Sequence, residues 1–125
     1  MNKLKFRIWD RDLKEMYNPE EIIIQLKGEE ILICHAESLH QFTNYELLQS
    51  TGLNGEDGVE IYEGDIVIYD RNISDTVDKF PYVVIYNEGN FVLEYGLIQH
   101  NLFNNTEYVT VIGNIYENSE LLEDK

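Results

Sequence analysis

The sequence predicts a mainly β fold, of the β or α+β class: a small barrel-like curled antiparallel sheet with short helical turns and a short C-terminal helix. Two observations lead to this prediction. Short runs of branched apolar and aromatic residues recur along the chain and are separated by glycine-containing turns, which is typical of the strands of a small barrel. No segment between these runs shows the amphipathic periodicity of the longer helices that parallel βαβ units need.

The first half of the chain contains three predicted strands. Residues 4–9, LKFRIW, alternate apolar and polar side chains, which is the pattern of a strand with one apolar face. Two branched apolar runs, residues 22–26 and 31–34, lie on either side of Gly28 and predict a hairpin. The apolar residues between 36 and 50 are loosely spaced, which predicts an irregular segment with a helical turn.

The stretch EIYEGDIVIYD, residues 60–70, predicts a strand that follows a tight turn. The turn falls at Asp57-Gly58, because glycine adopts the positive φ that such a turn requires. Gly64 is expected to provide a bulge or a second positive φ, and Asp65 to accept hydrogen bonds from nearby backbone N–H groups. We expect the acids to face water or lie in the turn, and the apolar residues to face inward: Ile61, Ile66 and Ile68.

The last third of the chain predicts a second hairpin and a closing strand. Residues 82–86 and 91–95 form the hairpin around Gly89, and residues 96–105 form a loop or helical turn. The last strand, residues 108–112, is expected to break at Gly113.

After that break, residues 115 and 116 are predicted to resume the sheet. A short helix follows, capped by Asn118 or Ser119, and residues 123–125 are expected to fray. Residues 70–81 are predicted to form a variable loop.

Length and composition indicate one domain over residues 1–125, with no linker, repeat or low-complexity tract. A single cysteine excludes an internal disulfide and a multi-cysteine metal site. The N-terminus lacks the apolar core of a signal peptide, and the longest uncharged apolar runs, such as residues 22–24, are too short to cross a bilayer. We therefore expect a cytoplasmic protein of a bacterial host cell.

Charge is the unusual bulk property of this sequence. Twenty-four acids against nine bases give a net charge of −15, and five of the bases lie in the first fourteen residues. A body this negative repels phosphate, whose binding depends on Lys and Arg. We expect no direct binding of nucleic acid and no membrane association.

Five acids near the glycine turns could in principle bind Ca²⁺ or Mg²⁺, which prefer several carboxylate and carbonyl oxygens. The EF-hand pattern fails, because Leu53 or Ser50 would occupy its first position, where an acid is needed. A solvated turn and edge is the favoured interpretation of these five acids: Glu56, Asp57, Glu60, Glu63 and Asp65.

Histidine and cysteine give no recognisable site either. His35 and His40 are five positions apart, which fits neither one helix face nor a HExxH zinc site, and the third histidine is His100. Cys34 and His35 are adjacent in a predicted strand and point to opposite faces, so Cys34 is interpreted as a core residue. Hydrolase and nucleotide-binding motifs are absent from the sequence. We predict no catalytic, cofactor-binding or metal-binding residue, no cofactor and no enzymatic activity.

Aromatic residues could line a face that stacks nucleic-acid bases, but such a face also needs a basic groove. The chain has no Lys or Arg between residues 28 and 70. Core packing and subunit contacts therefore explain the aromatic residues better: Trp9, Tyr62, Tyr69, Tyr82, Tyr86, Phe91 and Tyr95.

Three segments together resemble the YopX-like family of small bacteriophage and prophage proteins: KFRIWDRDLKEMY at residues 5–17, FTNYELLQSTGLNGEDGVEIYEGDIVIY at 42–69 and VIGNIYENSELL at 111–122. Family members commonly have a proline where this chain has Ser119, and residues 70–81 have no match. The resemblance implies a mostly β fold with a barrel-like part, a phage or prophage gene context and no established biochemical activity.

Three functional hypotheses follow. The leading one is a non-enzymatic phage accessory protein that binds another protein or associates with itself through exposed strand edges and aromatic surface. The alternative is an acidic DNA mimic that inhibits a host DNA-acting enzyme, which would require the acids in two rows on one face. The third is an enzyme with a carboxylate pair in an apolar cleft.

Overall fold

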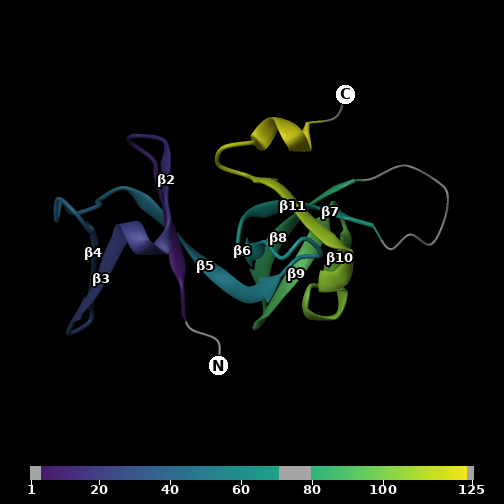
Figure 1. Ribbon diagram of the computed structural model, residues 1–125, viewed down its shortest axis with the longest axis horizontal. Helices are drawn as coiled ribbons and strands as arrows, with labels where there is room; N and C mark the ends of the chain where they lie inside the picture. The colour runs from purple at the N-terminus through teal and green to yellow at the C-terminus, as the bar shows by residue number, and fades with distance from the viewer. Residues whose placement is uncertain (1–3, 71–79, 124–125) are drawn as a thin grey trace. The chain divides into compact units, whose positions relative to one another are not determined.

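The computed structural model describes residues 4–70 and 80–123, and in these ranges it consists of strands joined by turns and short 3-10 helices (Figure 1). The prediction of a mainly β protein with a curled antiparallel sheet is confirmed. The chain divides into two compact units, whose described parts are residues 4–49 and 50–123. The prediction of one domain over residues 1–125 stays a prediction. It requires the two units to unfold together. Among the described residues, no helix is long and apolar enough to span a membrane.

Unit 1 contains two small antiparallel sheets. The first strand, β1 (Phe6–Asp10), pairs with β2 (Glu15–Tyr17) on one side and with the start of β5 (Tyr45–Asn54) on the other. The predicted hairpin is confirmed as β3 (Ile22–Lys27) and β4 (Glu30–His35), which form a separate two-stranded sheet. The core of the unit is a small cluster of buried side chains: Ile8, Tyr17, Ile33 and Phe42.

The prediction of an irregular segment over residues 36–50 is wrong from Tyr45 onward, because β5 begins there and is the longest strand described. The first half of β5 has few β-branched residues, so its sequence alone favours a strand only weakly. It becomes a strand because it pairs with β1 over five residues, from Phe6 opposite Gln49 to Asp10 opposite Tyr45. Tertiary pairing thus determines its conformation.

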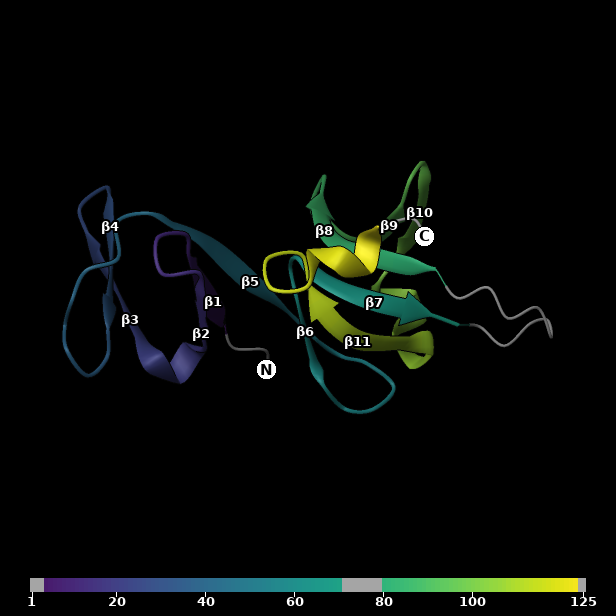
Figure 2. The same cartoon turned by 90° about the horizontal axis from the view of Figure 1, so that it is seen from above.

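Unit 2 is built around a five-stranded antiparallel sheet in the order β10-β9-β8-β7-β11, which curls into a half-barrel (Figure 2). Its strands are β7 (Asp65–Tyr69), β8 (Pro81–Asn87), β9 (Asn90–Tyr95), β10 (Ile98–Asn101) and β11 (Val109–Asn114). The short strand β6 (Glu60–Tyr62) pairs with the second half of β5. The predicted hairpin around Gly89 is confirmed as β8 and β9.

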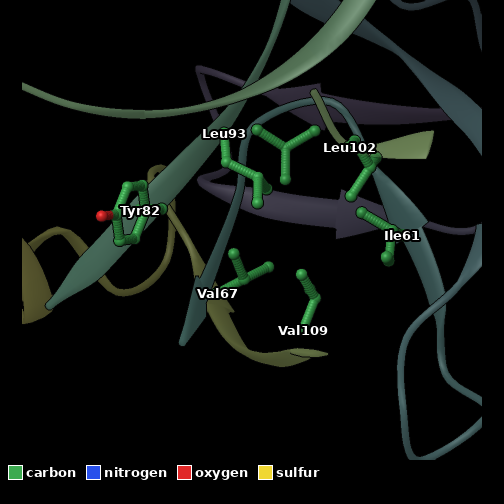
Figure 3. Packing of buried hydrophobic residues seen from close by; sticks show 7 residues of the cluster. Ile61, Val67, Tyr82, Leu93, Leu102 and Val109 are labelled. Atoms are coloured by element: carbon green, nitrogen blue, oxygen red, sulfur yellow. The ribbon is translucent and has the colours of Figure 1, made fainter. Parts of the chain in front are cut away.

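Figure 3 shows the core of unit 2, where buried side chains pack together. Side chains from six strands or their connections meet there, and burying each one contributes about 1.5–3 kcal/mol. The cluster consists of Ile61, Val67, Tyr82, Val84, Leu93, Leu102 and Val109.

The stretch EIYEGDIVIYD forms β6, a turn and β7. Gly64 has a φ of 88°, and the Asp65 carboxylate accepts a hydrogen bond from the Tyr62 backbone N–H at 2.8 Å, so both predictions for this turn are confirmed. The prediction that the acids face water is wrong for Asp65, whose residue is only 2% exposed. Ile61 and Ile66 are buried as predicted, but Val67, on the other face of β7, is buried as well.

Both faces of β7 are therefore covered, whereas the prediction assumed one wet face. Val67 on one face belongs to the core of unit 2, and Ile66 on the other face is fully buried, while β8 and β11 lie along the two edges of β7. Ile68, predicted to face inward, is only half-buried near the end of the strand.

Predictions for the last third are confirmed in part. A helical turn does form within residues 96–105, as the start of a 3-10 helix, Phe103–Tyr108, but the strand β10 before it was not predicted. Gly113 does not break the last strand; a bulge between Val111 and Gly113 lets β11 continue to Asn114.

Beyond Asn114 the chain turns away, so residues 115 and 116 do not resume the sheet. The turn forms because Asn118 Oδ1 accepts the backbone N–H of Asn114 at 3.1 Å. A Cβ atom on Gly113 would lie 2.6 Å from that oxygen, so glycine permits the approach.

The C-terminal helix is confirmed as one 3-10 turn, Ser119–Leu122, with Asn118 at its N-cap position. Of the variable loop predicted over residues 70–81, residues 71–79 lie outside the described residues. Of the fraying predicted over 123–125, residues 124 and 125 lie outside them too.

We expect Asp65→Ala to lower the free energy of unfolding by about 2 kcal/mol, because the variant leaves a buried backbone N–H without its acceptor. Chemical denaturation of the variant and the wild type measures this loss.

Asp57→Ala is the matched control for Asp65→Ala. Its carboxylate accepts the Val59 N–H at 3.2 Å in an exposed turn, so its removal should cost about 0.5 kcal/mol. Equal losses for the two variants would contradict a special role for the buried carboxylate.

Candidate functional site

Three of the five acids near the glycine turns accept local hydrogen bonds. Asp57 and Asp65 accept the backbone bonds described above, and Glu60 accepts the hydroxyl of Ser50. Within the described ranges, no three His, Cys, Asp or Glu side chains are placed together to hold a metal ion.

The histidines lie in different surroundings. His35 belongs to the ring cluster of unit 1, and His40 follows it in the loop after β4. His100 lies in unit 2, with its ring 4.8 Å from that of Tyr69. Cys34, interpreted as a core residue, is a half-buried free thiol opposite Ile23.

The seven aromatic residues singled out in the sequence do not form one exposed face. Trp9 belongs to unit 1 and the other six belong to unit 2. Tyr62 and Tyr82 are buried, and the Tyr82 ring packs 5.6 Å from Tyr69 and 5.7 Å from Tyr95. Most of these rings therefore pack within unit 2, whereas Tyr86 is exposed.

A pocket of about 330 Å³ in unit 1 is the best candidate site. Its apolar wall consists of three rings: His35 and Phe42 stack at 5.5 Å with 23° between their planes, and Tyr17 meets His35 edge to face at 4.6 Å. Its polar wall includes Asp10 and Asp12 from the turn between β1 and β2. We call it the aromatic pocket.

Hydrogen bonds fix the acidic wall of the aromatic pocket. Asp10 Oδ1 accepts the backbone N–H groups of Asp12 and Leu13 at 2.9 and 3.2 Å, which closes the turn after β1. Asp12 Oδ1 accepts the Asn44 side-chain amide at 2.9 Å. Arg11, between the two acids, bonds Asn44 Oδ1 and pairs with Glu46, so its charge is directed toward the β5 side of the turn.

Tyr17 supplies the floor of the ring cluster and is itself buried. Its hydroxyl donates a hydrogen bond to Glu15 Oε2 at 2.8 Å. This bond, followed by burial and the nearby carboxylates of Glu15, Asp10 and Glu21, raises the pKa of Tyr17 to about 12. The hydroxyl therefore stays protonated at neutral pH and serves as a hydrogen-bond donor, not as a base or nucleophile.

Carboxylates beside ring faces suit a cationic group. An ammonium or guanidinium can stack on an aromatic ring and pair with a carboxylate at the same time. Sequence reasoning did not select this site. Its only local signal is the Asp-Arg-Asp turn at residues 10–12, while the ring wall joins Tyr17 to residues 35 and 42 through long-range packing.

Fold and pocket together define a mainly β protein of two compact units, with a curled half-barrel in unit 2 and an acid-lined aromatic pocket in unit 1. The model of the YopX protein family matches residues 5–123. The chain therefore belongs to the YopX family.

Two solved structures share this fold. Protein EF1440 from Enterococcus faecalis is 30% identical, with a TM-score of 0.65, over 98% of this chain and 100% of that one. Protein yopX from Bacillus subtilis is 21% identical, with a TM-score of 0.70, over the same shares of the two chains: 98% and 100%. The comparison with curated proteins found no match.

The raised pKa of Tyr17 predicts a loss of stability in strong alkali. The unfolded chain releases this proton near pH 10, whereas the folded chain keeps it until about 12. The contribution to stability is therefore fully present below pH 10 and falls as the pH rises from 10 to 12. Unfolding measured across this window should show a fall that Tyr17→Phe lacks.

Ultraviolet titration of the tyrosines gives a second measurement. Burial also raises the pKa of Tyr82, so the readout is the difference between variant and wild type. Tyr17→Phe should remove part of the late step. An unchanged late step in Tyr17→Phe would contradict the Tyr17–Glu15 bond.

Proposed function

We propose that this protein is a phage or prophage accessory protein that works without catalysis, in the bacterial cytoplasm, by binding another protein or a second copy of itself. The observation that carries the proposal is the aromatic pocket, in which stacked rings lie beside two carboxylates. The partner we infer presents a lysine or arginine side chain. The phage setting comes from the family resemblance, since YopX-like proteins occur in phages and prophages.

The pocket favours a basic side chain for three reasons. Asp10 and Asp12 supply negative charge at its rim, and His35 and Phe42 supply stacking surface. The volume, about 330 Å³, accommodates the end of one long side chain. The net charge of −15 draws positively charged partners from a distance and repels acidic ones.

The acidic DNA-mimic function is kept as the alternative, and the large excess of acids is what favours it. The two functions differ in the partner they require. A mimic occupies the DNA-binding site of a host enzyme, so DNA would compete with this protein for that enzyme. Binding through the aromatic pocket depends on two carboxylates and three rings, and DNA would not displace a partner held there unless the partner itself binds DNA.

We expect Asp12→Asn to weaken binding of a basic side chain about tenfold, because it removes a charge-assisted contact and keeps an acceptor for Asn44. The probes are acetyl-argininamide and acetyl-lysinamide, titrated into isotope-labelled protein. Amide signals of Leu13 and Gln41, which line the pocket, should shift.

Asp57→Asn is the matched control, because it removes the same charge from a turn in unit 2. It should leave the pocket titration unchanged. Affinity purification from host cells should then retain a partner on the wild type and on Asp57→Asn but not on Asp12→Asn. Absence of pocket shifts, or equal weakening by both variants, would contradict the proposed pocket.

A further inference from the structure

The β3–β4 hairpin has apolar surface that the described residues of the chain leave uncovered. Paired residues of the two strands share a face, and one face carries Ile24 opposite Ile33 and Leu26 opposite Ile31. Ile33 is buried in the unit 1 core, while Ile24, Leu26 and Ile31 are 37%, 77% and 49% exposed. The apolar face thus begins in the core and continues outward into solvent.

The hairpin also has a free strand edge. In the described part of the chain, β3 pairs only with β4, so its other side has no neighbouring strand. The β4 side is different, because residues 40–42 run along its base: Phe42 N–H bonds Ile33 C=O at 2.8 Å and His35 N–H bonds His40 C=O at 2.9 Å. The open edge of the hairpin is therefore β3.

Those two bonds reveal which backbone groups of β3 point outward. The Ile33 C=O and the His35 N–H point away from β3, so these two residues form non-hydrogen-bonded pairs with β3. Their opposite residues, Ile24 and Ile22, therefore point their own N–H and C=O groups away from β4. By the same alternation, Leu26 also points outward. The Ile22 N–H is already bonded to Pro19 C=O, so the open positions of the edge are the Ile22 C=O and the backbone groups of Ile24 and Leu26.

We propose that a second copy of this chain pairs with β3 edge to edge, antiparallel about a two-fold axis at Ile24, which joins two hairpins into a four-stranded sheet. The proposal rests on the proposed function, binding to proteins, and specifies a second copy as one partner. Ile24 exchanges both backbone hydrogen bonds with its own copy, and Leu26 N–H meets Ile22 C=O of the second copy. The exposed apolar faces become continuous across the axis.

The charges along β3 favour a second copy of the chain as the partner, and they favour the register with the axis at Ile24. Residues 22–27 contain no acid and end in Lys27, while Glu20 and Glu21 precede them and Glu29 and Glu30 follow. The two-fold axis at Ile24 brings Lys27 beside the acidic turn at Glu21 of the second copy, twice by symmetry. β3 is therefore complementary to itself within a chain whose net charge of −15 would otherwise keep copies apart.

Neighbouring registers lack this complementarity. The outward N–H and C=O groups of β3 belong to even-numbered residues, and those of one copy must face those of the other. The neighbouring positions of the two-fold axis that satisfy this condition are Ile23 and Gln25. An axis at Gln25 puts Glu21 opposite Glu29 of the second copy, and like charges directly opposite are destabilising. An axis at Ile23 puts Glu20 opposite Leu26 and aligns fewer apolar residues.

The test is the dissociation constant of the full-length dimer, from sedimentation and light scattering over a wide concentration range. The wild type should approach twice the chain mass as concentration rises. Lys27→Glu should raise the dissociation constant about tenfold or more, because both cross-strand pairs become repulsive. The double variant Glu21→Lys/Lys27→Glu reverses both charges and should restore the dimer.

Lys14→Glu is the matched control, because it makes the same change in net charge at the exposed turn between β1 and β2. It should weaken the dimer far less than Lys27→Glu. Hydrogen exchange gives a readout that does not depend on mass. The amides of Ile24 and Leu26 should exchange more slowly as the fraction of chains in the dimer rises.

A wild type that stays monomeric at every concentration overturns the inference, and so does a dimer that Lys27→Glu and Lys14→Glu weaken equally. Failure of the double variant to restore the dimer, with both variants folded by circular dichroism, overturns the register. The proposed function is tested separately: Lys27→Glu keeps the aromatic pocket, so it should still bind acetyl-argininamide. Loss of both activities in a folded Lys27→Glu variant would contradict the assignment of two surfaces.

Discussion

A buried carboxylate holds the turn from which unit 2 is organised. Asp65 accepts the Tyr62 N–H and thereby closes the chain between β6 and β7 around Gly64. The turn is also tied to its neighbours, since Gly64 N–H bonds Val84 C=O and Gly64 C=O accepts the Ile115 N–H. These bonds set the start of β7, the strand between β8 and β11, and so place Val67 in the core. A buried carboxyl group is costly to leave without hydrogen-bond partners, which makes this turn specific as well as stabilising.

The sequence predicts the elements whose signals are local. Gly28 and Gly89 each separate two branched or aromatic runs, and both hairpins form as predicted, because a glycine at positive φ permits the reversal that the flanking strands favour. The hydrogen bond from the Tyr62 N–H to the Asp65 carboxylate is equally local, since the two residues are three positions apart. The burial of Asp65 is not local, because Asp65 lies opposite Asn114 of β11, which is 49 positions along the chain.

Elements formed by distant partners escaped prediction. The first half of β5 is a strand because β1 lies beside it, and the aromatic pocket exists because Tyr17 packs against residues 35 and 42. Asp12 and Asn44, which fix its acidic rim, are 32 positions apart. In the sequence, the acids near the glycine turns were the candidates for a cation site. The acids that line a pocket, Asp10 and Asp12, lie instead at the end of β1 and in the turn after it.

One strand belongs to both compact units. Residues 45–49 of β5 pair with β1, and Ser50 and Asn54 further along the same strand pair with β6. The boundary between the units thus falls inside continuous secondary structure and not in a loop. A gene divided at this point would split β5, so each product would keep only part of the strand pairing that β5 makes. Recombination that exchanges domains usually divides genes at flexible linkers, and no linker separates the two units. The two units are expected to be inherited as a pair, in keeping with a family match that runs across both of them.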